Sequence, residues 1–211
     1  MPPLNIHNFL PRSRANGPGE RAVIWVQGCP RTCPGCFNPD TQEFADRKLI
    51  SVDKLKSQIL AIKGINGVTF SGGEPFAQAK QLAKLARRLR RCGLSVVCYT
   101  GYTLEQLQEG DEEGWTALLS EVDLQIDGPF IKSKRCYDPY RGSENQKIHF
   151  FSDRIKPYEM RGSQTTEFIL GRDGKISETG FPNSVGVDET FAEIEAILNS
   201  KQPTEVGRRK K

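Results

Sequence analysis

The chain has 211 residues, and its 30 lysines and arginines nearly balance 26 aspartates and glutamates, for a formal net charge of +4. At about 150 residues per domain, this length predicts one domain with a tail, large enough to bury a core without disulfides or a metal. No apolar run is long enough for a signal peptide or for a membrane span of about 18 residues. We therefore expect a cytoplasmic protein with no membrane partner, and the small basic excess gives no reason to expect nucleic acid as a partner.

Short apolar runs alternate with longer amphipathic stretches along the first half of the chain. The apolar runs, rich in Val, Ile and Phe, predict buried strands over residues 22–27, 67–71, 94–100 and 122–127. The amphipathic stretches predict helices over residues 51–62, 77–92 and 103–108. This order predicts an α/β fold with a parallel sheet and right-handed crossovers, either open or curled toward a barrel.

The pattern changes near residue 167. Two short runs on either side of Asp173-Gly174 predict a β-hairpin, over residues 167–170 and 175–179. A last helix is expected over residues 188–199, capped by Asp188. We therefore divide the chain into a core, a C-terminal extension packed on it and a basic, disordered tail, over residues 1–150, 151–200 and 201–211.

Three cysteines follow the first predicted strand closely, in the segment Cys29-Pro-Arg-Thr-Cys33-Pro-Gly-Cys36. The prolines and the glycine keep this segment out of a regular helix, so that it can wrap around a small object. In a reducing compartment, clustered cysteines indicate metal binding or catalysis rather than disulfides. Iron–sulfur clusters are held by thiolates, and three thiolates leave one iron of a four-iron cube open to a ligand from outside the protein.

Two other interpretations of the cysteines stay open. A structural zinc ion normally takes four ligands, and the only histidines, His7 and His149, lie far from the cysteines in the sequence. Zinc would therefore need a fourth ligand supplied by the fold. The three cysteines could also be incidental buried thiols.

A second motif, Ser71-Gly72-Gly73-Glu74-Pro75, ends the second predicted strand. Its glycines would let the backbone approach a ligand with no Cβ in the way, and Glu74 offers an acceptor to a cationic amine. Polar turns also end the next two strands, over residues 99–102 and 127–130. Because the carboxyl ends of parallel strands lie on one face of a sheet, we expect these turns and the cysteine loop to meet at one site.

The cysteine loop, the SGGEP turn, the YTGY and DGPF turns and the segment from Arg141 to Gln146 together resemble the activating proteins of anaerobic ribonucleotide reductase and pyruvate formate-lyase. These are radical S-adenosylmethionine enzymes. The resemblance implies a partial (βα) barrel and one 4Fe-4S cluster on Cys29, Cys33 and Cys36, with the fourth iron site taken by S-adenosylmethionine. It also implies that a 5′-deoxyadenosyl radical, formed by reductive cleavage of that cofactor, takes hydrogen from a glycine of a partner glycyl-radical enzyme. A flavodoxin or ferredoxin-type protein would be the reductant.

The same resemblance implies which residues touch the cofactor. No side chain is expected to be catalytic beyond the cluster and the cofactor themselves. The implied contacts are Gly72, Gly73, Glu74 and Pro75 for the methionine part, Gly35, Cys36, Phe37 and Thr100 for the nucleoside, and Asp127 for a polar group near the cofactor.

Two further functions are compatible with the motifs. One is a radical S-adenosylmethionine enzyme that acts on a small molecule or peptide, similar to 7-carboxy-7-deazaguanine synthase. The other is a binding module without enzymatic activity, stabilised by zinc or built like a ferredoxin. Cleavage of S-adenosylmethionine would separate the module from both enzymes, and a partner protein would separate the two enzymes from each other.

Overall fold

The computed structural model describes residues 2–110, 112–160, 166–171 and 176–180. The strands of its main sheet are β1 (Leu4–Ser13), β2 (Arg21–Val26), β3 (Lys48–Ile50), β4 (Gly67–Gly72), β5 (Ser95–Tyr99), β6 (Leu124–Asp127) and β7 (Lys147–Phe150). A separate hairpin consists of β8 (Thr166–Leu170) and β9 (Ile176–Gly180). The helices are α1 (Val52–Leu60), α2 (Ala79–Arg90), α3 (Leu104–Glu109) and α4 (Trp115–Leu119).

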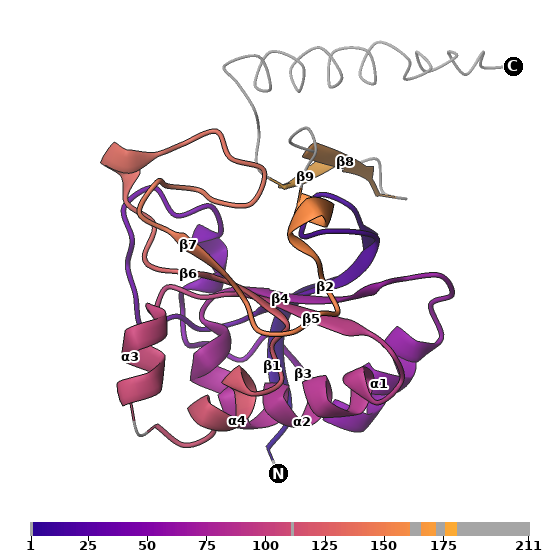
Figure 1. Cartoon of the computed structure of the whole chain (residues 1–211). Helices are drawn as coiled ribbons and strands as arrows, with labels where there is room; N and C mark the ends of the chain where they lie inside the picture. Colours follow the sequence, from indigo (N-terminus) through magenta and orange to yellow (C-terminus); the bar gives the residue numbers. More distant parts are fainter. Residues whose placement is uncertain (1, 111, 161–165, 172–175, 181–211) are drawn as a thin grey trace, which may run out of the picture.

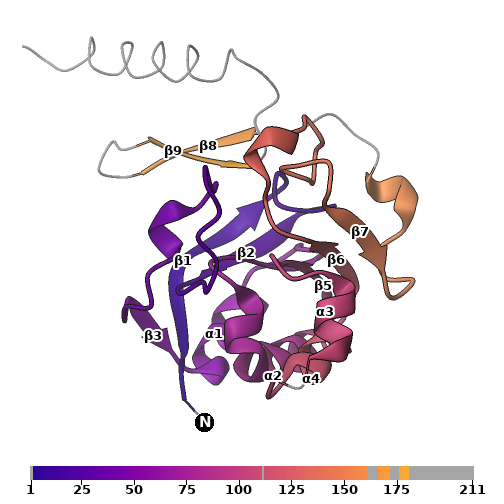
Figure 2. The same cartoon turned by 90° about the vertical axis from the view of Figure 1, so that its left-hand side faces the viewer.

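The main sheet has the strand order β3-β1-β2-β4-β5-β6-β7. Its helices gather on one face, and the β8–β9 hairpin lies over the opposite side (Figures 1 and 2). In the part of the chain that the structure describes, no helix is long and apolar enough to cross a membrane.

The centre of the sheet agrees with the prediction from the sequence. Strands β2, β4, β5 and β6 run parallel to one another, each within two residues of the predicted range. All six residues of β2 are buried, and Ala22, Ile24 and Val26 belong to the core cluster that contains the apolar residues of α1 and α2. The parallel arrangement brings the carboxyl ends of β4, β5 and β6 to one edge.

The edges of the sheet depart from the prediction of an all-parallel sheet. Strand β1 pairs antiparallel with β2 and β3, and β7 pairs antiparallel with β6. Strand β1 was not expected, because Pro11 and several polar residues interrupt its apolar pattern. The observed fold is therefore a mixed α/β sheet.

Local signals explain where the helices begin. The Ser51 side chain accepts a hydrogen bond from the backbone N–H of Lys54 at the start of α1. Thr103 and Gln106 form a capping box at the start of α3. Helix α2 buries its apolar stripe against the sheet, including Leu82, Leu85, Ala86 and Leu89.

The C-terminal region is described in part. Strands β8 and β9 pair antiparallel from Thr166↔Gly180 to Leu170↔Ile176, which confirms the predicted hairpin. The predicted turn at Asp173-Gly174 and the predicted helix over residues 188–199 lie outside the described residues.

Candidate functional site

Four of the predicted motifs converge on one cavity near the carboxyl ends of β4, β5 and β6. The cysteine loop forms one side of the cavity, and the turns after these strands form the other. The predicted site residues that line it are Cys29, Cys33, Cys36, Phe37, Gly72, Gly73, Glu74 and Thr100. The structure thus brings together most of the positions that the sequence singled out.

The cysteine loop is closed at its base by backbone hydrogen bonds. The N–H of Cys29 donates to Gln42 O at 2.9 Å, and the N–H of Gly28 donates to Thr41 O at 2.8 Å. The chain beyond the third cysteine therefore returns against the start of the loop. Burial raises the pKa of the Cys29 thiol to about 11, so this thiol stays protonated at neutral pH until a metal displaces the proton.

The donor set of this cavity fits an iron–sulfur cluster better than a closed zinc site. The cysteines are half-buried free thiols, and no histidine lines the cavity among the described residues. The carboxylate at the cavity, Glu74, accepts two hydrogen bonds at Oε1 and one at Oε2. In the described ranges no three histidine, cysteine, aspartate or glutamate side chains lie closely enough together to hold a single metal ion. A four-iron cube, by contrast, takes its thiolates at separate corners.

The Gly-Gly turn after β4 is joined to the start of the cysteine loop. The N–H of Gly73 donates to Val26 O, and the N–H of Glu74 donates to Gly28 O, both at 2.9 Å. Gly72 has a φ of +99°, a conformation that favours glycine. A Cβ on Gly73 would lie 2.3 Å from Gly28 O. The contact that requires a glycine at Gly73 is therefore this crossing of two backbones, whereas the sequence had suggested the approach of a ligand.

Glu74 is a buried carboxylate with three hydrogen-bond donors around it. Only 1% of the residue is exposed. It accepts hydrogen bonds from Thr100 Oγ1 and the N–H of Gly101, each at 2.8 Å, and from the N–H of Phe76 at 3.0 Å. Burial raises its pKa, and these three bonds act in the opposite direction because they stabilise the ionised form. The result is an oriented carboxylate beside the thiols.

Arg31, which lies between the first two cysteines, also lines the cavity. Its guanidinium carbon lies 4.4 Å from the centroid of the Tyr102 ring, and its Nη2 donates to Gln106 Oε1 at 3.3 Å. Its Nε is buried and has no acceptor among the described residues. A buried donor of this kind could serve an anionic group in the cavity. Arg31 was not among the site residues expected from the sequence, although its place within the cysteine motif was a usable signal.

Three predicted site residues do not line the cavity. Pro75 is buried at the first position of the short 3-10 helix that follows Glu74, so it shapes the turn. Gly35 has a φ of +74°, and a Cβ there would meet the side chain of Lys132. Asp127 accepts hydrogen bonds from the N–H of Leu104 at 2.5 Å and from the N–H of Lys147 at 3.3 Å. Its carboxylate is thus bonded at the starts of α3 and β7, and Asp127 is not among the residues that line the cavity.

The far side of the cavity comes from the loop after β6, where Gly128 and Phe130 belong to the polar turn expected from the strand order, and Gly142 and Gln146 to a segment identified only through the family resemblance. Gln146 Oε1 accepts a hydrogen bond from the N–H of Gly142 at 2.8 Å, and its Nε2 donates to Gly128 O at 3.0 Å. Phe130 packs edge-on against Phe37 with ring centroids 5.0 Å apart. These contacts fold the loop back over the cysteines.

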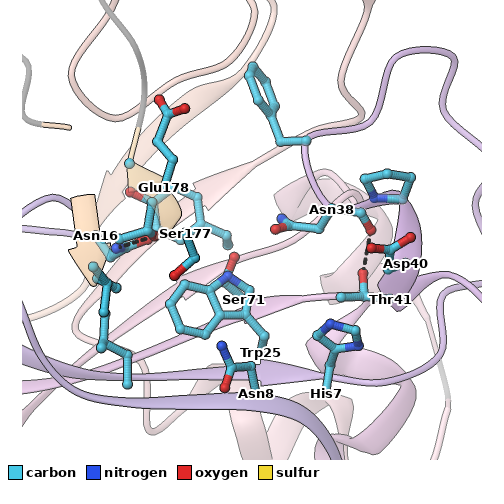
Figure 3. Close-up of a pocket in the computed structure, with 17 residues that line it drawn as sticks. His7, Asn8, Asn16, Trp25, Asn38, Asp40, Thr41, Ser71, Ser177 and Glu178 are labelled. Carbon is cyan, nitrogen blue, oxygen red and sulfur yellow. Dashed lines mark hydrogen bonds between the residues drawn. The ribbon is translucent and has the colours of Figure 1, made fainter. Parts of the chain in front are cut away.

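A second, larger cavity of about 460 Å³ opens beside the first and is called the chamber here. Figure 3 shows Trp25 and Ser71 in its middle, Asn38 and Thr41 on one side, and Ser177 of β9 on the other. The two cavities share the lining residues Phe37, Asn38, Thr41, Ser71 and Tyr99. A molecule in the chamber would therefore lie next to the cysteine cavity.

Known proteins share this chain's core. The model of the family described as 4Fe-4S single cluster domain matches residues 15–149. The anaerobic ribonucleoside-triphosphate reductase-activating protein of Vibrio cholerae is 32% identical over 160 residues, which cover 71% of this chain and 99% of that protein. The protein of the same name from Escherichia coli is 30% identical over 160 residues, covering 69% and 98%, and that of Enterobacteria phage T4 is 28% identical over 158 residues, covering 72% and 97%.

Among solved structures, the crystal structure of QueE from Escherichia coli overlaps 48% of this chain and 52% of that chain at 22% identity. Its TM-score of 0.35 is too low to support an argument about the fold. The sequence matches, in contrast, span nearly the whole length of the relatives. The chain is therefore a member of the family of anaerobic ribonucleoside-triphosphate reductase-activating proteins, radical S-adenosylmethionine enzymes with a 4Fe-4S cluster.

Proposed function

We propose that this chain activates an anaerobic ribonucleoside-triphosphate reductase, or a closely related glycyl-radical enzyme, by removing a hydrogen atom from one of its glycines. The observation that carries the proposal is the meeting of three free thiols with the buried carboxylate of Glu74 around one cavity. The thiols are suited to an iron–sulfur cube with an open corner, and the carboxylate is suited to the ammonium of an amino acid.

The proposed reaction needs one electron from outside the protein, which we assign to a flavodoxin or ferredoxin-type reductant. A 4Fe-4S cluster held by Cys29, Cys33 and Cys36 would supply this electron to the sulfonium of S-adenosylmethionine, and breaking the C5′–S bond would give methionine and a 5′-deoxyadenosyl radical. Transfer of hydrogen from the Cα of a partner glycine then gives 5′-deoxyadenosine and a glycyl radical. The chemistry belongs to the cofactor, and the protein provides binding and orientation.

In this proposal the residues of the cavity have separate roles. Cys29, Cys33 and Cys36 each hold one iron, and Glu74 accepts the ammonium of the methionine part. We assign the buried Nε of Arg31, which has no acceptor among the described residues, as a donor to the carboxylate of the same amino acid. The four parallel strands with helices on one face support a partial barrel that opens toward the chamber.

The test of cofactor cleavage is chromatography after anaerobic reaction. Cluster-loaded protein, reduced with dithionite and mixed with S-adenosylmethionine, should release 5′-deoxyadenosine and methionine slowly without any partner. The Cys36→Ala variant should release neither, whereas Cys92→Ala, which removes an exposed thiol away from the cavity, should behave like the wild type. A reduced, cluster-loaded wild-type protein that releases no 5′-deoxyadenosine would leave only the binding-module function.

A further inference from the structure

We propose that the β8–β9 hairpin is a partner-selecting wall of the chamber, and that the chamber receives an extended polypeptide segment carrying the target glycine. The inference rests on the proposed function and adds to it the place where the partner binds. It also gives a role to a part of the chain that lies beyond residue 149, where the match to the cluster-domain family ends.

The hairpin presents one of its two faces to the rest of the protein. Side chains alternate along paired strands, so the pairs Glu167↔Thr179 and Ile169↔Ser177 lie on the same face. Ile169, Ser177 and Thr179 line the chamber, and Glu167 does not. The next pair, Leu170↔Ile176, belongs to the other face, and Leu170 is 61% exposed. The hairpin therefore has an inner face toward the chamber and an outer face that carries the exposed Leu170, although Glu178 and Gly180 of the outer face also border the chamber.

Polar contacts fasten the inner face to the segment that follows β1. Glu167 accepts hydrogen bonds from Ser13 Oγ at 2.5 Å and from the N–H of Arg14 at 2.7 Å. Asn16 Nδ2 donates to Thr179 Oγ1 at 2.9 Å, and Figure 3 shows this contact beside Ser177. These bonds hold β9 at a fixed distance from the sheet, so the hairpin sets the width of the chamber.

The chamber also has the right position for a substrate. It shares five lining residues with the cysteine cavity, among them Ser71 at the end of β4 and Tyr99 at the end of β5. An occupant would therefore lie beside a cofactor held by the thiols. Hydrogen abstraction requires this proximity, because the reacting atoms must approach to about van der Waals contact.

The charge of the chamber favours a polypeptide over a phosphorylated or carboxylated small molecule. No lysine or arginine is found among its described lining residues, and the lining includes the carboxylates of Asp40 and Glu178. Anionic substrates are normally bound by cationic side chains or by helix N-termini. The lining is rich instead in amides and hydroxyls, such as Asn8, Ser71 and Ser177, which can both donate to and accept from a peptide backbone.

The test compares two substitutions of the same kind on opposite faces of the hairpin. Ser177→Phe adds a ring on the inner face, and Leu170→Phe adds one on the outer face. Both cluster-loaded variants are measured for iron content, for 5′-deoxyadenosine released without a partner, and for the glycyl radical formed on the anaerobic ribonucleoside-triphosphate reductase of the same organism. Circular dichroism of each variant reports whether the fold is retained.

We expect Ser177→Phe to keep its iron and its partner-free release of 5′-deoxyadenosine within about twofold of the wild type, while the glycyl radical falls by about tenfold or more, since the ring fills space that the segment needs. Leu170→Phe should match the wild type in iron content, in partner-free release of 5′-deoxyadenosine and in glycyl-radical yield. Glu167→Ala, which removes the acceptor of two docking bonds, should raise amide exchange across β9 and also lower the radical yield.

Two outcomes would overturn the inference. If Ser177→Phe activates the reductase as well as Leu170→Phe does, the chamber is not the binding site of the partner. If it loses partner-free cleavage together with the radical, the chamber holds the cofactor instead. Failure of the proposed function has a different signature, because the wild-type protein itself would then release no 5′-deoxyadenosine or form no radical.

Discussion

Thr100 Oγ1 donates a hydrogen bond of 2.8 Å to Glu74 Oε1 and thereby joins the turn after β5 to the turn after β4. The same hydroxyl oxygen accepts from the N–H of Tyr102 at 3.2 Å. Thr100 is 5% exposed, so little water is available to replace the bond to the carboxylate. This pair fixes the direction of the carboxylate that we assign to the ammonium of S-adenosylmethionine.

Replacing Thr100 with valine keeps the shape of the side chain and removes its hydroxyl. We predict that Thr100→Val retains the cluster but binds S-adenosylmethionine about tenfold more weakly, because a hydrogen bond to a charged group contributes about 1.5–3 kcal/mol. Calorimetry on the reconstituted protein measures the affinity. Thr116→Val, at an exposed position of α4, is the matched control and should bind like the wild type. Unchanged affinity in Thr100→Val would remove this bond from the cofactor site.

Because the backbone of Gly73 contacts that of Gly28, we predict that a substitution in the turn after β4 also disturbs the cysteine loop. Gly73→Ala would place a Cβ 2.3 Å from Gly28 O and 2.8 Å from Thr41 O, and both are backbone atoms that cannot move aside easily. We expect lower iron content after reconstitution and a loss of about 1–3 kcal/mol in the free energy of unfolding. Iron analysis and denaturant unfolding measure these effects. Gly64→Ala adds a Cβ that meets nothing within 4 Å, so any loss in that variant reports the strain of alanine at a φ of +76° and not a steric contact. Full iron and unchanged stability in Gly73→Ala would contradict the proposed crossing.

The raised pKa of Glu74 predicts how cofactor binding depends on pH. Burial shifts the pKa upward from the ordinary value of 4.5, and only the ionised carboxylate attracts an ammonium. Affinity for S-adenosylmethionine should therefore be present above the raised pKa and fall as the pH is lowered through it, at a higher pH than for an exposed glutamate. Calorimetry between about pH 5 and pH 8 would show this slope. Glu74→Gln should bind weakly with no slope, and an equal slope in that variant would mean that another group titrates.

A substitution of Asp127 tests whether this residue stabilises the fold or contacts the cofactor. Its buried carboxylate accepts from two backbone N–H groups and lies 3.1 Å from His149 Nε2. We predict that Asp127→Ala lowers the free energy of unfolding by about 1–3 kcal/mol, since buried donors lose their acceptor. Affinity for S-adenosylmethionine should stay within about twofold of the wild type. Urea unfolding and calorimetry test the two parts, with the exposed Asp46→Ala as control. A tenfold loss of affinity at full stability would restore the role first expected for Asp127.

The sequence predicted those features that depend on local patterns. Strand β4 ends at Gly72, within one residue of the expected limit, because its apolar run stops at a glycine pair. The cysteine loop and the turn after β4 were expected to meet because both follow neighbouring parallel strands, and they do line one cavity. The identities of the cofactor and of the partner were predicted from the family resemblance, because the chemistry of the residues alone left several alternatives open.

Features that depend on contacts between distant segments could not be predicted. The direction of the Asp127 side chain is decided by its bond to the N–H of Leu104, and no local pattern reveals it. The need for a glycine at Gly73 comes from Gly28, which belongs to another strand end. Strand β1 is held by pairing with β2 and β3 despite Pro11, so tertiary pairing overrides its weak local pattern.

The central claim is that the cysteine cavity generates a radical that ends on a partner protein. Electron paramagnetic resonance of the anaerobic ribonucleoside-triphosphate reductase of the same organism tests this claim, after incubation with the reduced, cluster-loaded protein and S-adenosylmethionine. We predict a stable doublet signal from a glycyl radical, formed along with 5′-deoxyadenosine and absent when Cys36→Ala replaces the wild type. Release of 5′-deoxyadenosine with no doublet on the reductase, or on any other glycyl-radical enzyme of that organism, would contradict the account and favour a small-molecule substrate.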